Sequence, residues 1–258
     1  MKPALLLLSA LVLPASALPW IDPVPSESMR DLAADRPDTT ESPITVDRGH
    51  VQLEASLYDW SRERSDDVHT FMAMNLKVGI AEDTDLQFVW DAWQMENLGG
   101  PLQDRSGSSD LTIRLKQNLW GNDGGTTAFA VFPFVTIPIG GGMGGDEWEA
   151  GLILPFSMEL TDRIGLGLMA EFDWVADGAR GYDLEIVHSA VLGFDLTDRW
   201  GCFTEYVGVL KEASYEASVA AGVTCMIHSN LMLDAGLRVG LNDAAEDFGL
   251  FTGWTIRY

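Results

Sequence analysis

From Gly49 to the last residue, large apolar side chains recur at every second position, in runs separated by polar connections. In 111–116, for example, Leu, Ile and Leu alternate with Thr, Arg and Lys. A spacing of two places alternate side chains on opposite faces of a β-strand. The chain is therefore expected to be all-β, with one apolar and one polar or small-residue face on each strand.

The connections between these runs are of two kinds, which alternate along the chain. Five are short, and two of these repeat Leu-Thr-Asp-Arg, at 160–165 and 196–201; the others lie at 80–86, 120–125 and 228–230. Six others, most of them longer and rich in Gly, Asp and Ser, lie at about 61–67, 94–109, 140–147, 175–181, 211–214 and 243–247. This alternation is typical of a transmembrane antiparallel up-and-down β-barrel and predicts about 12 strands, with both ends in the periplasm.

The first residues have the pattern of an export signal. Met1-Lys2 is basic, 5–13 is an apolar run, and Ala15-Ser16-Ala17 matches a cleavage site. An uncleaved membrane anchor is the alternative, but the run is short for a span. We therefore expect a signal peptide at 1–17, an irregular periplasmic segment with five prolines at 18–48 (the lead-in), and a barrel at 49–258.

Charge and hydropathy restrict the partners. The net charge is −23, with 16 Lys and Arg against 39 Asp and Glu. We expect no nucleic-acid partner, because a basic cluster for binding phosphates is absent. No run after the signal has the roughly 20 apolar residues of a spanning helix. A membrane would have to be crossed by a closed barrel, which pairs every backbone polar group.

The turns also predict which residues face the lumen. One arc of the wall would carry basic residues: Lys77, Arg114, Lys116, Arg238 and Arg257. The opposite arc would carry acidic residues: Glu149, Glu159, Glu171, Asp173, Glu185 and Glu205. Opposed charges across a narrow lumen either orient polar solutes or pair and plug the barrel. The sequence leaves both readings open.

Aromatic residues gather at the predicted strand ends. They are Trp60, Trp90, Trp93, Trp120, Trp148, Trp174, Trp200, Trp254 and Tyr258. Amphipathic rings collect at the two interfaces of a bilayer, so outer-membrane lipid is an expected partner; the alternative is the aromatic core of a soluble β-sandwich. The alternating run 248–258 ends on an aromatic, which is typical of strands read by the barrel-assembly machinery of Gram-negative bacteria.

One stretch before the first expected strand is distinctive. It reads Ala-Asp-Arg-Pro-Asp-Thr-Thr-Glu-Ser-Pro at 34–43, followed by Val46 and by Gly-His-Val-Gln-Leu-Glu at 49–54. This opening resembles that of the outer-membrane transporter family named after the MetA pathway of phenol degradation. The resemblance continues through the strands and turns over about 34–258. It implies an outer-membrane β-barrel with a role in uptake.

Candidate chemistry is sparse. Cys202 and Cys225 lie on the apolar face of neighbouring predicted strands, where they either form a disulfide or remain free. His188 and Ser189 are consecutive, so they face opposite sides of a strand and make a poor catalytic pair, and His69 has no evident serine partner. We expect no catalytic residues, metal site or cofactor. Loop 94–109 either constricts the lumen or stays outside as a mobile loop, and the Gly-rich run 140–145 favours a flexible loop.

These features favour a passive outer-membrane channel for small solutes, including aromatic or hydrophobic ones. A plugged structural or adhesive barrel is the second hypothesis, and an outer-membrane lipid-modifying enzyme is the third.

Overall fold

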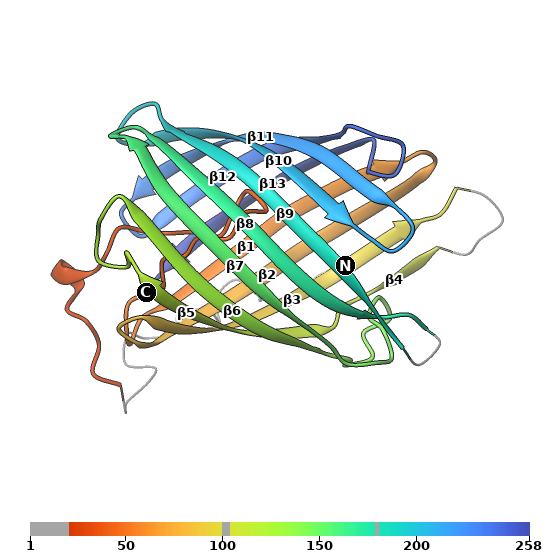
Figure 1. Ribbon diagram of the computed structural model, residues 1–258, viewed down its shortest axis with the longest axis horizontal. Helices are drawn as coiled ribbons and strands as arrows, with labels where there is room; N and C mark the ends of the chain where they lie inside the picture. Colours follow the sequence, from red (N-terminus) through yellow and green to blue (C-terminus); the bar gives the residue numbers. More distant parts are fainter. Residues whose placement is uncertain (1–20, 100–103, 179–180) are drawn as a thin grey trace, which may run out of the picture.

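The computed structural model describes residues 21–99, 104–178 and 181–258, so the expected signal peptide lies outside the described residues. Twelve long strands and the short β4 form one tilted sheet that closes on itself (Figure 1). The strands are β1 (Val51–Glu63), β2 (Asp66–Ala81), β3 (Thr84–Asn97), β4 (Arg105–Gly107), β5 (Leu111–Trp120), β6 (Thr127–Ile137), β7 (Glu149–Thr161), β8 (Ile164–Ala176), β9 (Tyr182–Asp195), β10 (Trp200–Leu210), β11 (Tyr215–His228), β12 (Leu231–Gly240) and β13 (Phe248–Arg257).

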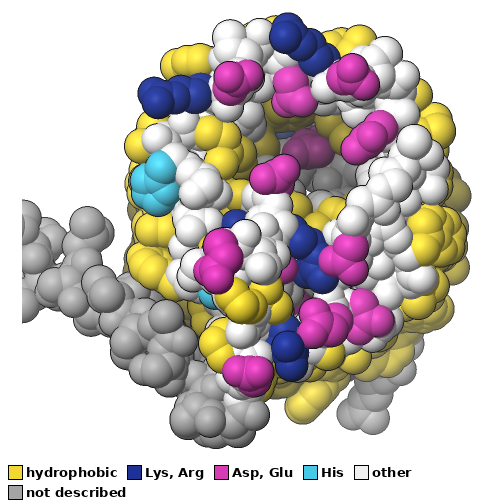
Figure 2. Space-filling view, turned by 90° about the vertical axis from the view of Figure 1, so that its left-hand side faces the viewer, with side chains coloured by type: hydrophobic (Ala, Val, Ile, Leu, Met, Phe, Trp, Pro, Cys, Tyr) yellow, Lys and Arg dark blue, Asp and Glu magenta, His cyan; other side chains and the backbone are white. Residues whose placement is uncertain are grey.

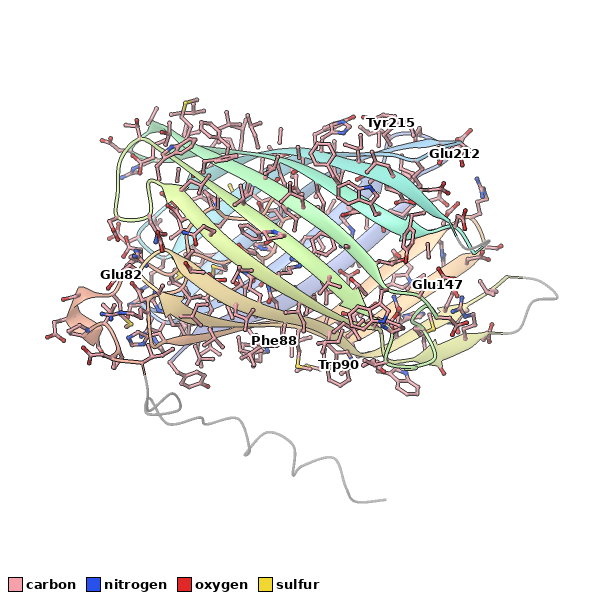
Figure 3. All side chains as sticks on the ribbon, turned by 60° about the horizontal axis from the view of Figure 1, so that its bottom comes forward. Glu82, Phe88, Trp90, Glu147, Glu212 and Tyr215 are labelled. Atoms are coloured by element: carbon pink, nitrogen blue, oxygen red, sulfur yellow. The ribbon has the colours of Figure 1, made fainter. Side chains whose placement is uncertain are left out.

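Sequential long strands pair antiparallel all the way round, and β1 closes the ring by pairing with both β2 and β13. The predicted up-and-down barrel is therefore confirmed. Short connections lie at one end, which we call the short-turn end, and longer loops at the other, the loop end. Figure 3 shows Glu82 at the short-turn end and Glu147 and Glu212 at the loop end. No helix among the described residues is long and apolar enough to cross a membrane.

The connections at the loop end differ from expectation in two places. The predicted loop at 61–67 is a tight turn, because β1 runs to Glu63, β2 starts at Asp66, and Arg64 takes a left-handed φ of 53°. Loop 94–109 was expected either to constrict the lumen or to be mobile, and the Gly-rich run 140–145 to be flexible; the described parts of these two loops bind each other. Ser108 N–H donates to the Gly141 carbonyl at 2.7 Å, an approach that leaves no room for a side chain at Gly107.

The two faces of the wall divide as the alternation predicted. On the outside, Leu168, Leu233 and Leu250 are between 40% and 43% exposed. On the inside, Lys77 and Lys116 are each only 1% exposed. A charge buried this far from water is costly unless it is paired, so the lumen must contain counter-charges.

Candidate functional site: the barrel lumen

The counter-charge that Lys77 and Lys116 share comes from the lead-in. The sequence placed residues 18–48 outside the barrel, but this is wrong for the part around 34–47, which is irregular as expected and lies inside the lumen. Asp35 pairs with Lys77 on β2 and with Lys116 on β5, the latter at 2.9 Å, and Lys77 also pairs with Glu54 on β1. The sequence suggested ionic pairing between opposite walls; the pairs instead join the walls to the lead-in or join strands that lie close together, as Lys77–Glu54 does.

Further along the lead-in, residues close together in sequence bind different strands. Arg36 pairs with Asp234 on β12 at 2.7 Å. Thr40 donates both its N–H, at 2.7 Å, and its hydroxyl, at 2.6 Å, to Glu205 on β10. Glu41 accepts a hydrogen bond from the Arg114 guanidinium on β5 at 2.6 Å. These contacts fix the lead-in across the lumen without any regular secondary structure.

Where the lead-in leaves the lumen, it binds the seam between the first and last strands. Asp47 pairs with Arg257 at 3.3 Å and with Arg30 at 3.1 Å. The two ring nitrogens of His50 lie 2.9 Å from the carbonyl of Tyr258 and 2.8 Å from that of Val24. The short-turn end of the β1–β13 pairing is therefore covered by the lead-in.

The buried carboxyls of the lead-in have strongly shifted pKa values. Burial opposes ionisation of Asp35, but the charges of Lys116 and Lys77 together outweigh it and hold the pKa of Asp35 below its usual range. For Glu41, burial and then the negative charge of Asp35 outweigh Arg114 and raise the pKa to about 8. Asp35 is therefore the ionised member that anchors the segment at neutral pH.

The predicted lumen residues fall into two groups in the structure. The basic ones contact the lead-in, except Arg238, which pairs at 2.7 Å with both Asp59 on β1 and Glu246 in the last loop. The acidic ones on β7 to β9 remain near the wall: Asp173 lies opposite Glu185 in the β8–β9 register, and Glu149 accepts a hydrogen bond from Ala176 N–H at 3.0 Å. Glu171 has no ion pair among the described residues.

The lumen also has an apolar wall that the sequence did not predict. Buried side chains on β6 to β8 form one cluster, which consists of Ala130, Phe132, Ile153 and Met169. Buried side chains on β9 to β13 form a second, which consists of Val191, Phe203, Ala220 and Phe251. The sequence of the first cluster's strand, Phe-Ala-Val-Phe-Pro-Phe-Val at 129–135, is apolar on both faces. This pattern indicates an apolar lumen surface here, but polarity alone cannot identify which face points inward. The lumen is thus mainly polar on the β1–β5 side, whereas on the other side apolar clusters lie beside the acidic residues of β7 to β10.

Between the lead-in and this second side lies a cavity of about 920 Å³. Gly165 on β8 and Gly193 on β9 lie opposite each other in its wall, and a side chain added at either would meet nothing within 4 Å. Glu159 also lines this cavity. Figure 2, viewed at the short-turn end, shows a hollow that opens into the barrel, with charged side chains around its rim. The lead-in therefore narrows the lumen but does not fill it.

Comparison with known proteins agrees with this architecture. The family model described as "Putative MetA-pathway of phenol degradation" matches residues 34–258. The chain belongs to this family. No curated protein matches the chain significantly.

Solved structures of outer-membrane channels share the fold of this family member. An outer membrane channel from Pseudomonas putida F1 is 13% identical, with a TM-score of 0.62 over 87% of this chain and 100% of that chain. The NanC porin is 8% identical, with a TM-score of 0.55 over 80% of this chain and 98% of that one. The CymD monoaromatic hydrocarbon channel is 9% identical, with a TM-score of 0.50 over 81% and 88%. At these identities the likeness establishes the fold alone.

The remaining candidate residues of this family member lie outside the lumen, with one exception. Ser189 faces inward and lies 2.7 Å from the Thr40 hydroxyl, whereas His188 faces outward and lies 3.1 Å from the Tyr215 hydroxyl, so the two are separated by the wall as expected. His69 lies 2.8 Å from the Tyr58 hydroxyl. The described residues contain no group of three or more His, Cys, Asp or Glu that could hold a metal ion.

The two cysteines are free. The β10–β11 register places Cys202 opposite Val223 and Cys225 opposite Trp200, so the thiols are diagonal neighbours on the outer face and not a directly opposed pair. The disulfide that the sequence allowed is therefore not formed, because the register is offset by two residues.

Several of the predicted interface aromatics are highly exposed on the barrel. Trp93, Trp120, Trp148, Trp174 and Trp200 are between 46% and 56% exposed. Trp60 donates to Asp67 at 3.0 Å, and the Tyr258 backbone pairs with Val51. In Figure 3, Phe88 and Trp90 on β3 lie along the outer edge of the barrel.

Proposed function

We propose that the protein is exported by its signal peptide to the outer membrane of a Gram-negative cell. There it acts as a passive, non-enzymatic channel for small solutes, including aromatic or hydrophobic ones. The observation that carries this proposal is the cavity beside the lead-in, which opens at the short-turn end and is walled by glycines on one side and by residues 30–44 on the other. The solved structures that share the fold, an outer membrane channel, the NanC porin and the CymD monoaromatic hydrocarbon channel, support it.

The lining residues suggest how the passage would select solutes. Its two sides differ, because charged groups of the lead-in face a wall that is rich in glycine and includes the apolar Val191 and Phe203. A solute with a flat apolar part and a polar edge would contact both sides. The channel would work by diffusion alone, with the lead-in setting the width of the passage and the exposed tryptophans holding the barrel in the outer-membrane lipid.

The test is to fill the cavity from the wall. Gly193→Trp would place an indole in the open space, and Leu192→Trp, at the adjacent outward-facing position, is the matched control. We expect the conductance of the purified protein in planar bilayers, and the solute influx in liposome swelling, to fall in Gly193→Trp and to stay unchanged in Leu192→Trp. If Gly193→Trp conducts as the wild type does, the passage does not run beside the lead-in.

A plugged structural or adhesive barrel is the second candidate, and the ion pairs that hold the lead-in favour it. Absence of conductance in the wild-type protein, together with its appearance on removal of residues 21–47, would support this alternative.

A further inference from the structure

Three polar aromatic side chains meet on the outer face of the barrel near the loop end: His188 on β9, Tyr206 on β10 and Tyr215 on β11. His188 lies opposite Gly208 of β10, and Tyr215 lies opposite position 210 of the same strand. Positions 206, 208 and 210 share one face of β10, so the three rings lie together on the outside. Figure 3 shows Tyr215 at the loop end. Polar and ionisable side chains on a membrane-facing surface are costly, which makes these three a candidate for a function.

The three side chains form one hydrogen-bonded group, which we call the His–Tyr cluster. Nε2 of His188 lies 3.1 Å from the Tyr215 hydroxyl, and this hydroxyl is hydrogen-bonded in turn to that of Tyr206. The His188 and Tyr215 rings are stacked, with their centres 5.8 Å apart and their planes 13° apart. A Cβ at Gly208 would lie 2.3 Å from the Tyr215 hydroxyl and 2.5 Å from His188. The strand between the two rings therefore carries no side chain where they meet.

The His–Tyr cluster has one hydrogen-bond donor more than it uses. A neutral imidazole has one N–H and each phenol has one O–H, which makes three donors for two hydrogen bonds. Depending on the tautomer, the third donor is Nδ1–H of His188 or the hydroxyl of Tyr206, and neither has a further partner among the described residues. A protonated imidazole would leave two donors free and add a positive charge. Because the hydrocarbon region holds no water, the acceptor has to come from the lipid headgroups at this depth.

The two ends of the barrel differ in this respect. A second pair lies elsewhere on the wall toward the loop end, where Nδ1 of His69 on β2 is 2.8 Å from the Tyr58 hydroxyl on β1 and the ring centres are 6.1 Å apart. At the short-turn end the most exposed rings are Trp120 and Trp200. There, no histidine side chain contacts a tyrosine side chain among the described residues. An outer membrane has the same asymmetry, with sugar and phosphate headgroups of lipopolysaccharide outside and phospholipid inside.

We propose that the His–Tyr cluster binds the phosphorylated sugar headgroup of a lipopolysaccharide molecule in the leaflet around the loop end. The free donor of the cluster goes to a phosphate or sugar oxygen, and the stacked rings offer the sugar a flat apolar face with a polar edge. The acyl chains lie along the apolar wall beside the cluster, which includes Val219 and Val223, at 36% and 44% exposure. This inference rests on the proposed location in the outer membrane, with the loop end outside.

Native mass spectrometry of the full chain in detergent tests the site. The protein is refolded from inclusion bodies, so that it carries no lipid, and is titrated with lipid A, with dephosphorylated lipid A and with phosphatidylglycerol. The double variant His188→Phe with Tyr206→Phe removes the donors at both ends of the cluster and keeps the rings. The matched control is Tyr182→Phe with Leu192→Phe, which removes a hydroxyl that donates to a backbone carbonyl outside the cluster. Gly208→Ala is a second variant, which keeps every donor and separates the stacked rings.

We expect the wild type and the control to bind lipid A at least about tenfold more tightly than phosphatidylglycerol, because a hydrogen bond to a charged group is worth about that factor. The double variant and Gly208→Ala should lose this preference, while the folded band on semi-native gels verifies that both are folded. A loss confined to phosphorylated lipid A would identify a phosphate as the acceptor, and an equal loss for both forms of lipid A would identify a sugar oxygen.

Unchanged lipid A binding by the folded double variant would overturn the site. A wild type that binds phosphatidylglycerol as tightly as lipid A would also overturn it, since the rings would then act as a general interfacial belt. Conductance in planar bilayers is measured on the same preparations. A wild type that conducts without preferring lipid A keeps the channel and loses the site, whereas one that prefers lipid A without conducting keeps the site and loses the channel.

Discussion

Replacing Asp35 by Asn should loosen the lead-in. Asp35 is the carboxylate that Lys77 and Lys116 share, and both lysines are almost completely buried. In the variant Lys77 keeps Glu54, whereas Lys116 keeps no carboxylate: it retains the Ile44 carbonyl, at 3.1 Å, and the face of the Phe132 ring, whose centre lies 4.5 Å from Nζ. Leaving a buried charge without its partner costs about 3–5 kcal/mol. Since about 1.4 kcal/mol corresponds to a factor of ten, the ratio of docked to undocked lead-in should fall by about two to three and a half powers of ten.

Single-channel recording in planar bilayers would detect this change. The wild type should show one small conductance level, and Asp35→Asn should add excursions to a larger level when the lead-in leaves the lumen. The matched control is Glu27→Gln, which removes the same charge from an exposed position of the lead-in. Recordings of Asp35→Asn that cannot be distinguished from those of Glu27→Gln would refute the assignment of Asp35 as the anchor.

Three further outcomes are expected. Burial and the negative charge of Asp35 raise the pKa of Glu41 from 4.5 to about 8, so protonation of Glu41 stabilises the docked lead-in. This stabilisation is complete below pH 4.5 and is lost as the pH rises through about 8. Conductance should therefore rise over that pH interval in the wild type and not in Glu41→Gln. Maleimide labelling of detergent-solubilised protein should modify both Cys202 and Cys225 without prior reduction; a requirement for reductant would contradict the free thiols. His50→Ala loses two hydrogen bonds of about 0.5–1.5 kcal/mol each, so the folded band on semi-native gels should disappear at a lower temperature than in the wild type.

The strands could be predicted from the sequence because alternation is a local property. Runs such as 164–173 and 231–240 identify both the strand and its outward face, and the repeated Thr-Asp turns identify the short-turn end. The turn at 64–65 could not be predicted in this way. It depends on a left-handed Arg64, a conformation that the residue type does not favour.

The path of the lead-in could not be read from local sequence, since prolines and mixed charges at 34–43 fit a solvated linker equally well. An indirect signal existed: Lys77 and Lys116 were expected on the lumen face of a narrow barrel, where a lysine needs a nearby acid. The acids predicted on the opposite wall were the wrong partners, because a chain segment occupies the space between. Pairing of this kind depends on where distant parts of the chain meet, which no periodicity encodes.

The lead-in precedes every strand in the chain, yet the strands that bind it are spread around the circumference of the barrel, from the second strand to the last. Lys77 belongs to the second strand, Glu205 to the tenth, and Asp234 and Arg257 to the last two. Its binding site is complete only when the final strand has joined the first. The segment before the first strand can therefore make its full set of contacts only after every strand of the ring is in place.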